Sequence, residues 1–119
     1  MPIAAHTDCT ILASRGWHAW VDDHGTDGET RLLVFGQIDL PSPGHGVAWR
    51  TGPLDRMQPP SQRITLNVSR PEGMVAQVIT PTDTLIDLPT KIAAFRSVVV
   101  VCGEEVLAEI PDVGRLSSD

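Results

Sequence analysis

The chain has 119 residues, of which 41% are hydrophobic and 20% are charged, and its formal net charge is −6 at pH 7. This length and composition suit one globular domain that needs no metal or disulfide to fold. The acidic balance argues against nucleic-acid binding, which needs a basic face to neutralise phosphates. The most apolar run, Val98–Cys102, is far shorter than the roughly 18 residues of a membrane helix, so no membrane partner is expected.

The ten prolines divide most of the chain into strand-length pieces. Proline cannot donate to a helix or to an inner strand pairing, so each one is expected at a turn or a strand end. Turn signals at a spacing of roughly 8–12 residues are typical of β-sandwiches and β-barrels. We therefore predict an all-β fold, an antiparallel two-sheet β-sandwich of immunoglobulin-like type, with a small closed β-barrel as the alternative.

Alternating apolar and polar residues place the individual strands. Near the N-terminus, Thr10–Ala13 and Trp17–Val21 are predicted strands, with a turn or bulge between them at 14–16. The polar segment 23–29 is a predicted loop. The later predicted strands, in chain order, are Thr30–Asp39, Gly46–Gly52, Ser61–Ser69, Gly73–Thr80, Thr84–Leu88, Phe95–Cys102 and Val106–Ile110.

The predicted domain spans residues 1–112, and residues 113–119 are expected to form a flexible C-terminal tail. The side chains on the apolar faces of the predicted strands should meet in one core. The expected core residues are Ile11, Trp17, Leu32, Val34, Trp49, Ile64, Leu66, Val68, Val78, Val99, Val101, Val106 and Ile110.

The N-terminal sequence lacks the basic segment and long apolar run of a signal peptide, so a cytoplasmic protein is expected. In that reducing compartment, Cys9 and Cys102 are predicted to be free thiols. They are far apart in sequence and form no Cys-x-x-Cys pair, which leaves a zinc or redox motif without support. Cys102 follows a run of valines and is expected to be a small buried hydrophobe.

Two features are the best candidates for a binding site. The first is the loop 40–46, which two prolines stiffen and which carries His45. The second is Trp20 beside His18, on the strand face opposite Trp17, because an exposed tryptophan often marks an interface. A rigid crossover loop and a strand covered on both faces are the structural alternatives. The candidate ligand- or partner-binding residues are Trp20, His18, Ser42, His45, Arg50 and Arg70.

Candidates for chemistry are fewer. His18, Asp22 and His45 could supply acid–base groups near neutral pH. A metal site would draw on His18, Asp22, Asp23 and His24. However, residues four apart in a strand are separated by about 13 Å at roughly 3.3 Å per residue, too far to ligate one ion directly. The sequence contains no phosphate loop and no dinucleotide fingerprint, and no cofactor is predicted.

The leading functional hypothesis is therefore a small non-catalytic binding or interaction module for an unknown protein or small ligand. Self-association through edge strands or an open sheet face, most simply as a homodimer, fits a small β protein. One alternative is a small enzyme that uses histidine and aspartate acid–base groups in a pocket between sheets or subunits. The other is a metal-binding protein.

Overall fold

The computed structural model describes residues 9–22, 30–92 and 94–116. These residues form eight strands and no helix. The strands are β1 (Ala13–Asp22), β2 (Thr30–Leu40), β3 (Gly46–Leu54), β4 (Ser61–Ser69), β5 (Thr80–Thr90), β6 (Ser97–Cys102), β7 (Glu105–Ile110) and β8 (Gly114–Leu116). Within the described ranges, no helix is long and apolar enough to cross a membrane. The all-β prediction is confirmed.

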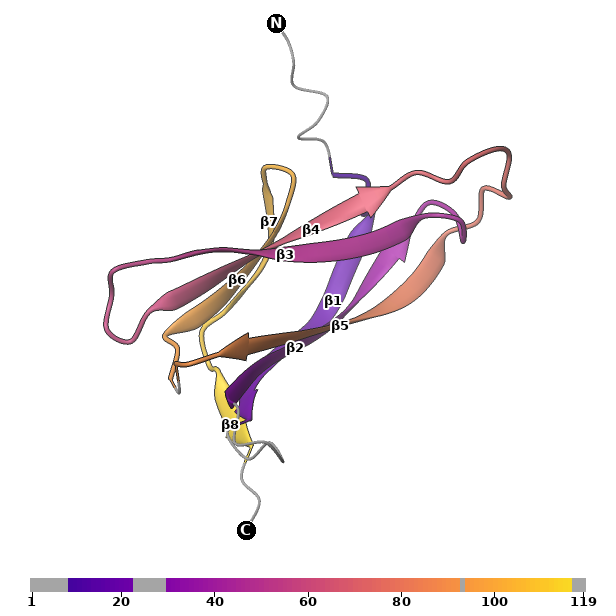
Figure 1. Cartoon of the computed structure of the whole chain (residues 1–119). Coiled ribbons are helices and arrows are strands. Elements are labelled where there is room, and N and C mark those ends of the chain that lie inside the picture. The colour runs from indigo at the N-terminus through magenta and orange to yellow at the C-terminus, as the bar shows by residue number, and fades with distance from the viewer. Residues whose placement is uncertain (1–8, 23–29, 93, 117–119) are drawn as a thin grey trace, which may run out of the picture.

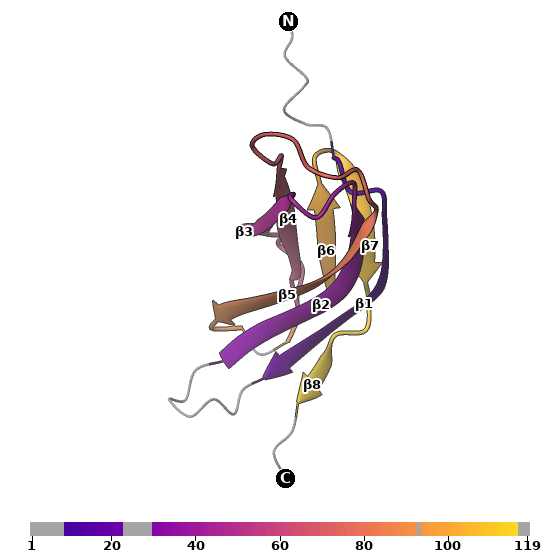
Figure 2. The same cartoon turned by 90° about the vertical axis from the view of Figure 1, so that its right-hand side faces the viewer.

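The strands form two four-stranded sheets that pack face to face (Figure 1 and Figure 2). The first sheet has the order β5-β2-β1-β8 and the second has the order β3-β4-β6-β7. The sheets stay separate, so the two-sheet prediction holds and the closed-barrel alternative does not. Both sheets are mixed rather than wholly antiparallel, because β8 runs parallel to β1 and β6 runs parallel to β4.

Strand β1 is continuous through the segment that the sequence left open as a turn or bulge. Gly16 has a φ of 69°, and the register against β2 shifts between Arg15 and His18. A left-handed residue in a bulge favours glycine, since a side chain there would be strained. Beyond the bulge, Ala19 and Val21 are buried against the core, as the alternation predicted.

The Trp17 indole lies over Gly36 on the core side of β2. A Cβ atom at Gly36 would lie 2.3 Å from the Trp17 ring, so the ring occupies the space that a side chain would need. The indole N–H donates to the Ser14 hydroxyl at 3.0 Å. A glycine covered by an aromatic ring on the neighbouring strand fixes the register of the pair. Trp17 thereby anchors β1 onto β2.

The core lies between the sheets, and most of the predicted core residues belong to it. Val78 and Val106 do not, since 57% and 60% of their surfaces are exposed. In β6 the fully buried valines are Val98 and Val100, whereas Val99 is half-buried. A run of identical valines carries no alternation, so the sequence could not set the phase of this strand. The fully buried core side chains include Leu32, Val34, Ile38, Ile64, Ile86, Val98 and Val100.

The predicted strand Gly73–Thr80 is wrong, and β5 is longer than expected. Residues 74–79 form no ladder, whereas β5 runs from Thr80 to Thr90 and contains Pro81 and Pro89. Strand β5 pairs with β2 along its whole length and lies at the edge of its sheet. An edge strand tolerates proline because one side of its backbone needs no ladder partner.

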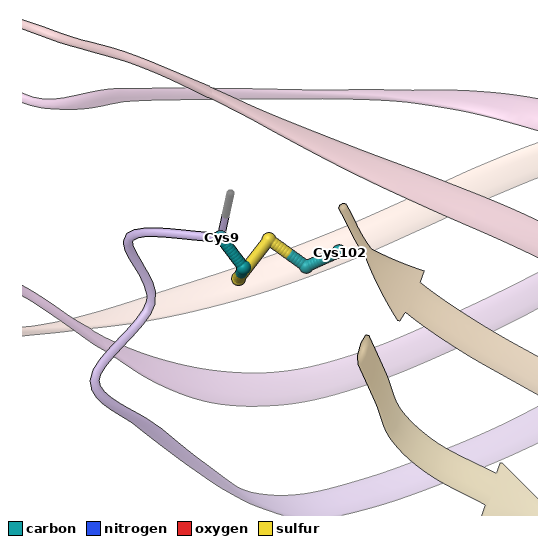
Figure 3. Close-up of a disulfide and its surroundings, with 2 residues drawn as sticks. All are labelled: Cys9 and Cys102. Atoms are coloured by element: carbon teal, nitrogen blue, oxygen red, sulfur yellow. A yellow bond between two sulfur atoms is a disulfide. The ribbon is translucent and has the colours of Figure 1, made fainter. Parts of the chain in front are cut away.

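Cys9 and Cys102 form a disulfide, so the prediction of free thiols was wrong (Figure 3). Their Cα atoms lie 5.3 Å apart although 93 positions separate them in sequence. The bond ties the segment before β1 to the end of β6, which belongs to the other sheet. The two cysteines come together only in the folded chain, so their spacing in the sequence does not predict the disulfide.

Part of the expected C-terminal tail is structured. Residues Gly114–Leu116 form β8 and pair in parallel with Trp20–Asp22. A Cβ atom at Gly114 would lie 3.2 Å from the Trp20 ring, so a small residue suits this close approach. Residues 117–119 and the loop 23–29 lie outside the described residues.

Candidate functional site

Two surface grooves, each of about 330 Å³, lie on opposite flanks of the sandwich. The aromatic groove lies where β1 faces β7 and the β7–β8 connection. The edge groove lies between β3 and β5, the edge strands of the two sheets. Both volumes fall near the lower end of the range of roughly 300–1,000 Å³ that is typical of small-molecule sites.

The aromatic groove contains the residue pair that the sequence singled out. The rings of His18 and Trp20 stack with centroids 5.9 Å apart and an interplanar angle of 22°. Residues two apart in a strand share a face, so the stacking follows from the strand itself. The groove's residues come from one stretch of β1 and from the chain around the end of β7: Trp17, His18, Ala19, Trp20, Ala108, Glu109, Ile110, Pro111, Asp112 and Gly114.

The charged side chains that line the aromatic groove are carboxylates. Glu109 and Asp112 are exposed at its wall, and the described lining contains no lysine or arginine. Neither carboxylate forms an ion pair within the described part of the chain. An indole face and a carboxylate both attract a positive charge. Trp17 and Trp20, from opposite faces of β1, line this groove together with Glu109 and Asp112. The arrangement suits a cationic group.

The edge groove combines inward-facing residues of β3 with the rim of β5. Its residues are His45, Val47, Trp49, Thr82, Asp83, Thr84 and Leu85. Val47 and Trp49 point toward the core side of β3 but stay half-buried, because the sheets are not joined along this flank. Leu85 is 62% exposed on the outer side of β5. The groove therefore has an apolar floor beside several polar side chains.

The loop that leads into β3 fixes the His45 ring. The fully buried Ser42 hydroxyl accepts the Gly44 N–H at 3.2 Å and lies 2.8 Å from His45 Nδ1. A buried hydroxyl needs an acceptor for its proton, which favours donation to Nδ1 and leaves the proton of the neutral ring on Nε2. Because Ser42 has no exposed surface, it orients the imidazole rather than acting as a nucleophile.

Two neighbouring residues of β5 have contrasting partners. Thr84 is 7% exposed, and its buried hydroxyl has no hydrogen-bond partner among the described residues. Asp83 accepts the Gln37 amide N–H at 3.2 Å, and Gln37 accepts from Arg15 at 2.7 Å. An unpartnered buried hydroxyl costs free energy, and this one is closed off from solvent.

The predicted acid–base residues are not brought together. His18 lines the aromatic groove, His45 lines the edge groove, and Asp22 belongs to the lining of neither. Arg50, on β3, and Arg70, just after β4, are exposed and also lie outside both linings. The structure thus places His18 and Trp20 beside one groove, and the other candidate residues lie elsewhere on the sandwich.

The metal hypothesis receives no support from the described residues. Across residues 9–22, 30–92 and 94–116, no three histidine, cysteine or carboxylate side chains cluster so that they could hold an ion. Asp23 and His24, two of the four candidate ligands, lie outside these ranges. His18 and Asp22 alone leave a site short of the three or four ligands that zinc requires.

Four residues that border the grooves are not singled out by the sequence. Glu109, Asp112, Asp83 and Thr84 were assigned no role, because each gains its significance from a strand distant in sequence. Trp49 was expected in the core, and it does pack against the core while one side borders the edge groove. A cue for Glu109 and Asp112 was present, since the C-terminal part of the chain is rich in carboxylates.

Comparison with known proteins adds no assignment. No protein-family model matches the chain, and no similar curated protein or solved structure was found. The two grooves and their side-chain chemistry are therefore the basis on which a function is inferred.

Proposed function

We propose that the protein is a non-catalytic binding module that holds an organic cation, an ammonium or guanidinium group, in the aromatic groove. One observation carries the proposal. Trp17, Trp20, Glu109 and Asp112 border a single groove of about 330 Å³ whose described lining contains no lysine or arginine. The stacked His18 ring extends the aromatic surface of the groove.

The expected affinity is modest. A cation over an indole gains about 0.5–2 kcal/mol, depending on how far it is desolvated. A solvent-exposed carboxylate adds about 0–1 kcal/mol, and salt weakens that part. The net charge of −6 draws cations toward the whole molecule. We therefore expect a dissociation constant in the millimolar range that rises with ionic strength.

Titration with a matched pair of small molecules tests the proposal. Choline carries a quaternary ammonium, and 3,3-dimethylbutan-1-ol has the same shape without the charge. We expect choline to change the tryptophan fluorescence and the ¹H–¹⁵N spectrum at β1 and β7. The neutral isostere should bind at least about fivefold more weakly, which corresponds to a cation contribution of the size given above. Equal affinities for the two molecules would refute the role of charge.

A pair of substitutions on one strand provides a matched control. Glu109 and Glu105 are both exposed residues of β7, but Glu105 lies outside the described lining of the groove. Glu109→Gln should weaken choline binding by about two- to fivefold, whereas Glu105→Gln should leave it unchanged. If both substitutions act equally, the attraction comes from net charge and not from the groove.

Self-association is the second function for which there is a specific observation. Met74, Val78 and Ile79 are exposed on the unpaired segment that precedes the edge strand β5. An apolar stretch next to an open sheet edge is a typical self-association surface. Size-exclusion chromatography with light scattering should show a dimer that dissociates on dilution. Monomer alone at high concentration would contradict this proposal.

The cellular location depends on the two cysteines. A cytoplasmic protein was expected, but the reducing cytosol rarely preserves a structural disulfide, and the structure joins Cys9 to Cys102. We therefore replace that expectation with an oxidising compartment. Alkylation of thiols before lysis, followed by mass measurement, decides between them. Unmodified cysteines support the oxidising compartment, and two alkylated cysteines support the cytoplasm.

A further inference from the structure

We infer that copies of this chain associate head to tail, with Arg50 of one copy entering the aromatic groove of the next. The inference rests on the proposed function and names the source of the cation, which is the guanidinium group of a second copy. Its basis is the sheet β3-β4-β6-β7, whose two edges carry opposite charges. The basic edge of one copy is therefore complementary to the acidic edge of its neighbour.

The basic edge of this sheet is formed by β3 and its neighbour β4. Arg50 is exposed on β3 and lies opposite Thr65 of β4. Arg63 is two residues from Thr65, so it shares this face. Its side-chain stem lies over Gly52 of β3, where an added Cβ atom would be 3.3 Å from the Arg63 Cβ atom. Neither guanidinium forms an ion pair with the residues that the structure describes, so both remain available to a partner.

The acidic edge is formed by β7 and the residues on either side of it. The segment 104–112 contains no basic residue and four carboxylates, which are Glu104, Glu105, Glu109 and Asp112. All four are exposed, and none has an ion-pair partner within the described ranges. Glu109 and Asp112 also line the aromatic groove. The acidic edge and the tryptophan rings therefore meet in this groove.

The charge distribution of the whole chain favours a second copy as the partner. Residues 46–70 carry four arginines against one aspartate, although the net charge of the chain is −6. Two acidic molecules repel each other, except where the basic edge of one faces an acidic surface of the other. A guanidinium group stacks on aromatic rings and pairs with carboxylates, and the aromatic groove contains both kinds of group.

This contact differs from self-association through the apolar segment that contains Met74, Val78 and Ile79. It joins two different surfaces, so a pair of copies still has an unoccupied basic edge at one end and an unoccupied groove at the other. It is also electrostatic. Raising the salt concentration from about 50 mM to about 500 mM should weaken it at least about threefold, whereas an apolar contact should not weaken.

Two double variants separate the two halves of the contact. The groove variant carries Glu109→Gln and Asp112→Asn and keeps the basic edge, whereas the edge variant carries Arg50→Gln and Arg63→Gln and keeps the groove. Adding unlabelled groove variant to ¹⁵N-labelled edge variant should produce saturable shifts at β1 and β7. Unlabelled edge variant should produce none there, because it has lost the arginines of the basic edge. Equal shifts from both, or no saturable shift up to about 3 mM, overturn the inference.

A matched pair of single changes assigns the contact to Arg50. In the unlabelled groove variant, adding Arg50→Gln in place of the wild-type arginine should weaken binding at least about threefold. Adding Lys91→Gln removes the same charge from the exposed position after β5, in the other sheet, and should leave binding unchanged. Equal effects would mean that net charge drives the association, which also overturns the inference.

Choline titration of the edge variant distinguishes this inference from the proposed function. The edge variant retains every residue of the groove lining, so it should bind choline as the wild type does. If it binds choline but not the groove variant, the cation site stands and a second copy is not its partner. If correctly folded edge variant and wild type both fail to bind choline, the proposed function is itself refuted. The denaturation midpoint checks the folding of each variant.

Discussion

The two flanks of the sandwich are built differently. On the β1–β7 flank the chain passes from one sheet to the other, since β7 belongs to the second sheet and β8 pairs with β1 in the first (Figure 2). On the β3–β5 flank no described strand pairing joins the two sheets. The tied flank carries a groove with uncompensated charges, and the open flank carries one with an unpartnered hydroxyl. Both flanks carry a groove, and the two grooves differ in the side chains that line them.

The largest effect on stability is expected from removing the disulfide between Cys9 and Cys102. Replacing both Cys9 and Cys102 by alanine should lower the free energy of unfolding by about 2–4 kcal/mol, because the bond restricts a long stretch of the unfolded chain. Urea denaturation measures the change. Reduced wild-type protein is the control and should resemble the double variant. An unchanged midpoint would mean that the disulfide adds nothing to the packing of the core between the sheets.

The next effect compares Gly36 of the inner strand β2, which lies under the Trp17 ring, with a glycine of the edge strand β3. Gly36→Ala should destabilise the protein by about 1–3 kcal/mol, because the new methyl group would overlap the Trp17 ring. Gly52→Ala, on the open flank, places its Cβ 3.3 Å from the flexible Arg63 stem, so a change within about 0.5 kcal/mol is expected. Adding Trp17→Leu to Gly36→Ala should recover part of the loss. Equal effects at the two glycines would contradict this contrast between the inner strand and the edge strand.

The sequence predicted the bounds of the inner strands β2 and β4 closely. Ser61–Ser69 was predicted with the bounds of β4, and Thr30–Asp39 differs from β2 by one residue. Both strands lie inside their sheets, where burial of one face enforces a regular alternation. For β5 the sequence predicts only the middle, Thr84–Leu88, because Pro81 and Pro89 are expected to mark strand ends. At a sheet edge this inference fails, since only one side of the backbone is paired.

The sequence predicts only those contacts of the site that lie within a single strand. Side chains two positions apart in a strand share a face, which predicts that His18 lies beside Trp20. The two rings are stacked in the structure. Their acidic neighbours Glu109 and Asp112 come from a part of the chain some 90 positions away. The disulfide has the same origin, since its two halves meet through the fold. Long-range proximity is not encoded in any single segment, so these parts of the site required the structure.

The smallest expected effect concerns how β3 is held on the open flank. With no described pairing to β5, its position depends on β4 and on their connecting loop. In that loop the Asp55 carboxylate accepts the backbone N–H groups of Ser61 at 2.9 Å and Met57 at 3.1 Å. The Ser61 N–H is the main cause that lowers the pKa of Asp55 below its ordinary value of 3.8.

Because the pKa of Asp55 is lower in the folded state, its ionised carboxylate stabilises the protein at pH values above the ordinary pKa. This contribution is lost as the pH falls through the pKa of the folded state. Asp55→Asn should therefore lower the unfolding midpoint slightly at pH 7, with a difference from wild type that shrinks toward about pH 3. Asp55 is fully exposed to water, which keeps the effect small. Urea denaturation at several pH values measures it. A difference that does not depend on pH would mean that the loop is held by its backbone shape, and that β3 needs no charged contact to keep the edge groove open.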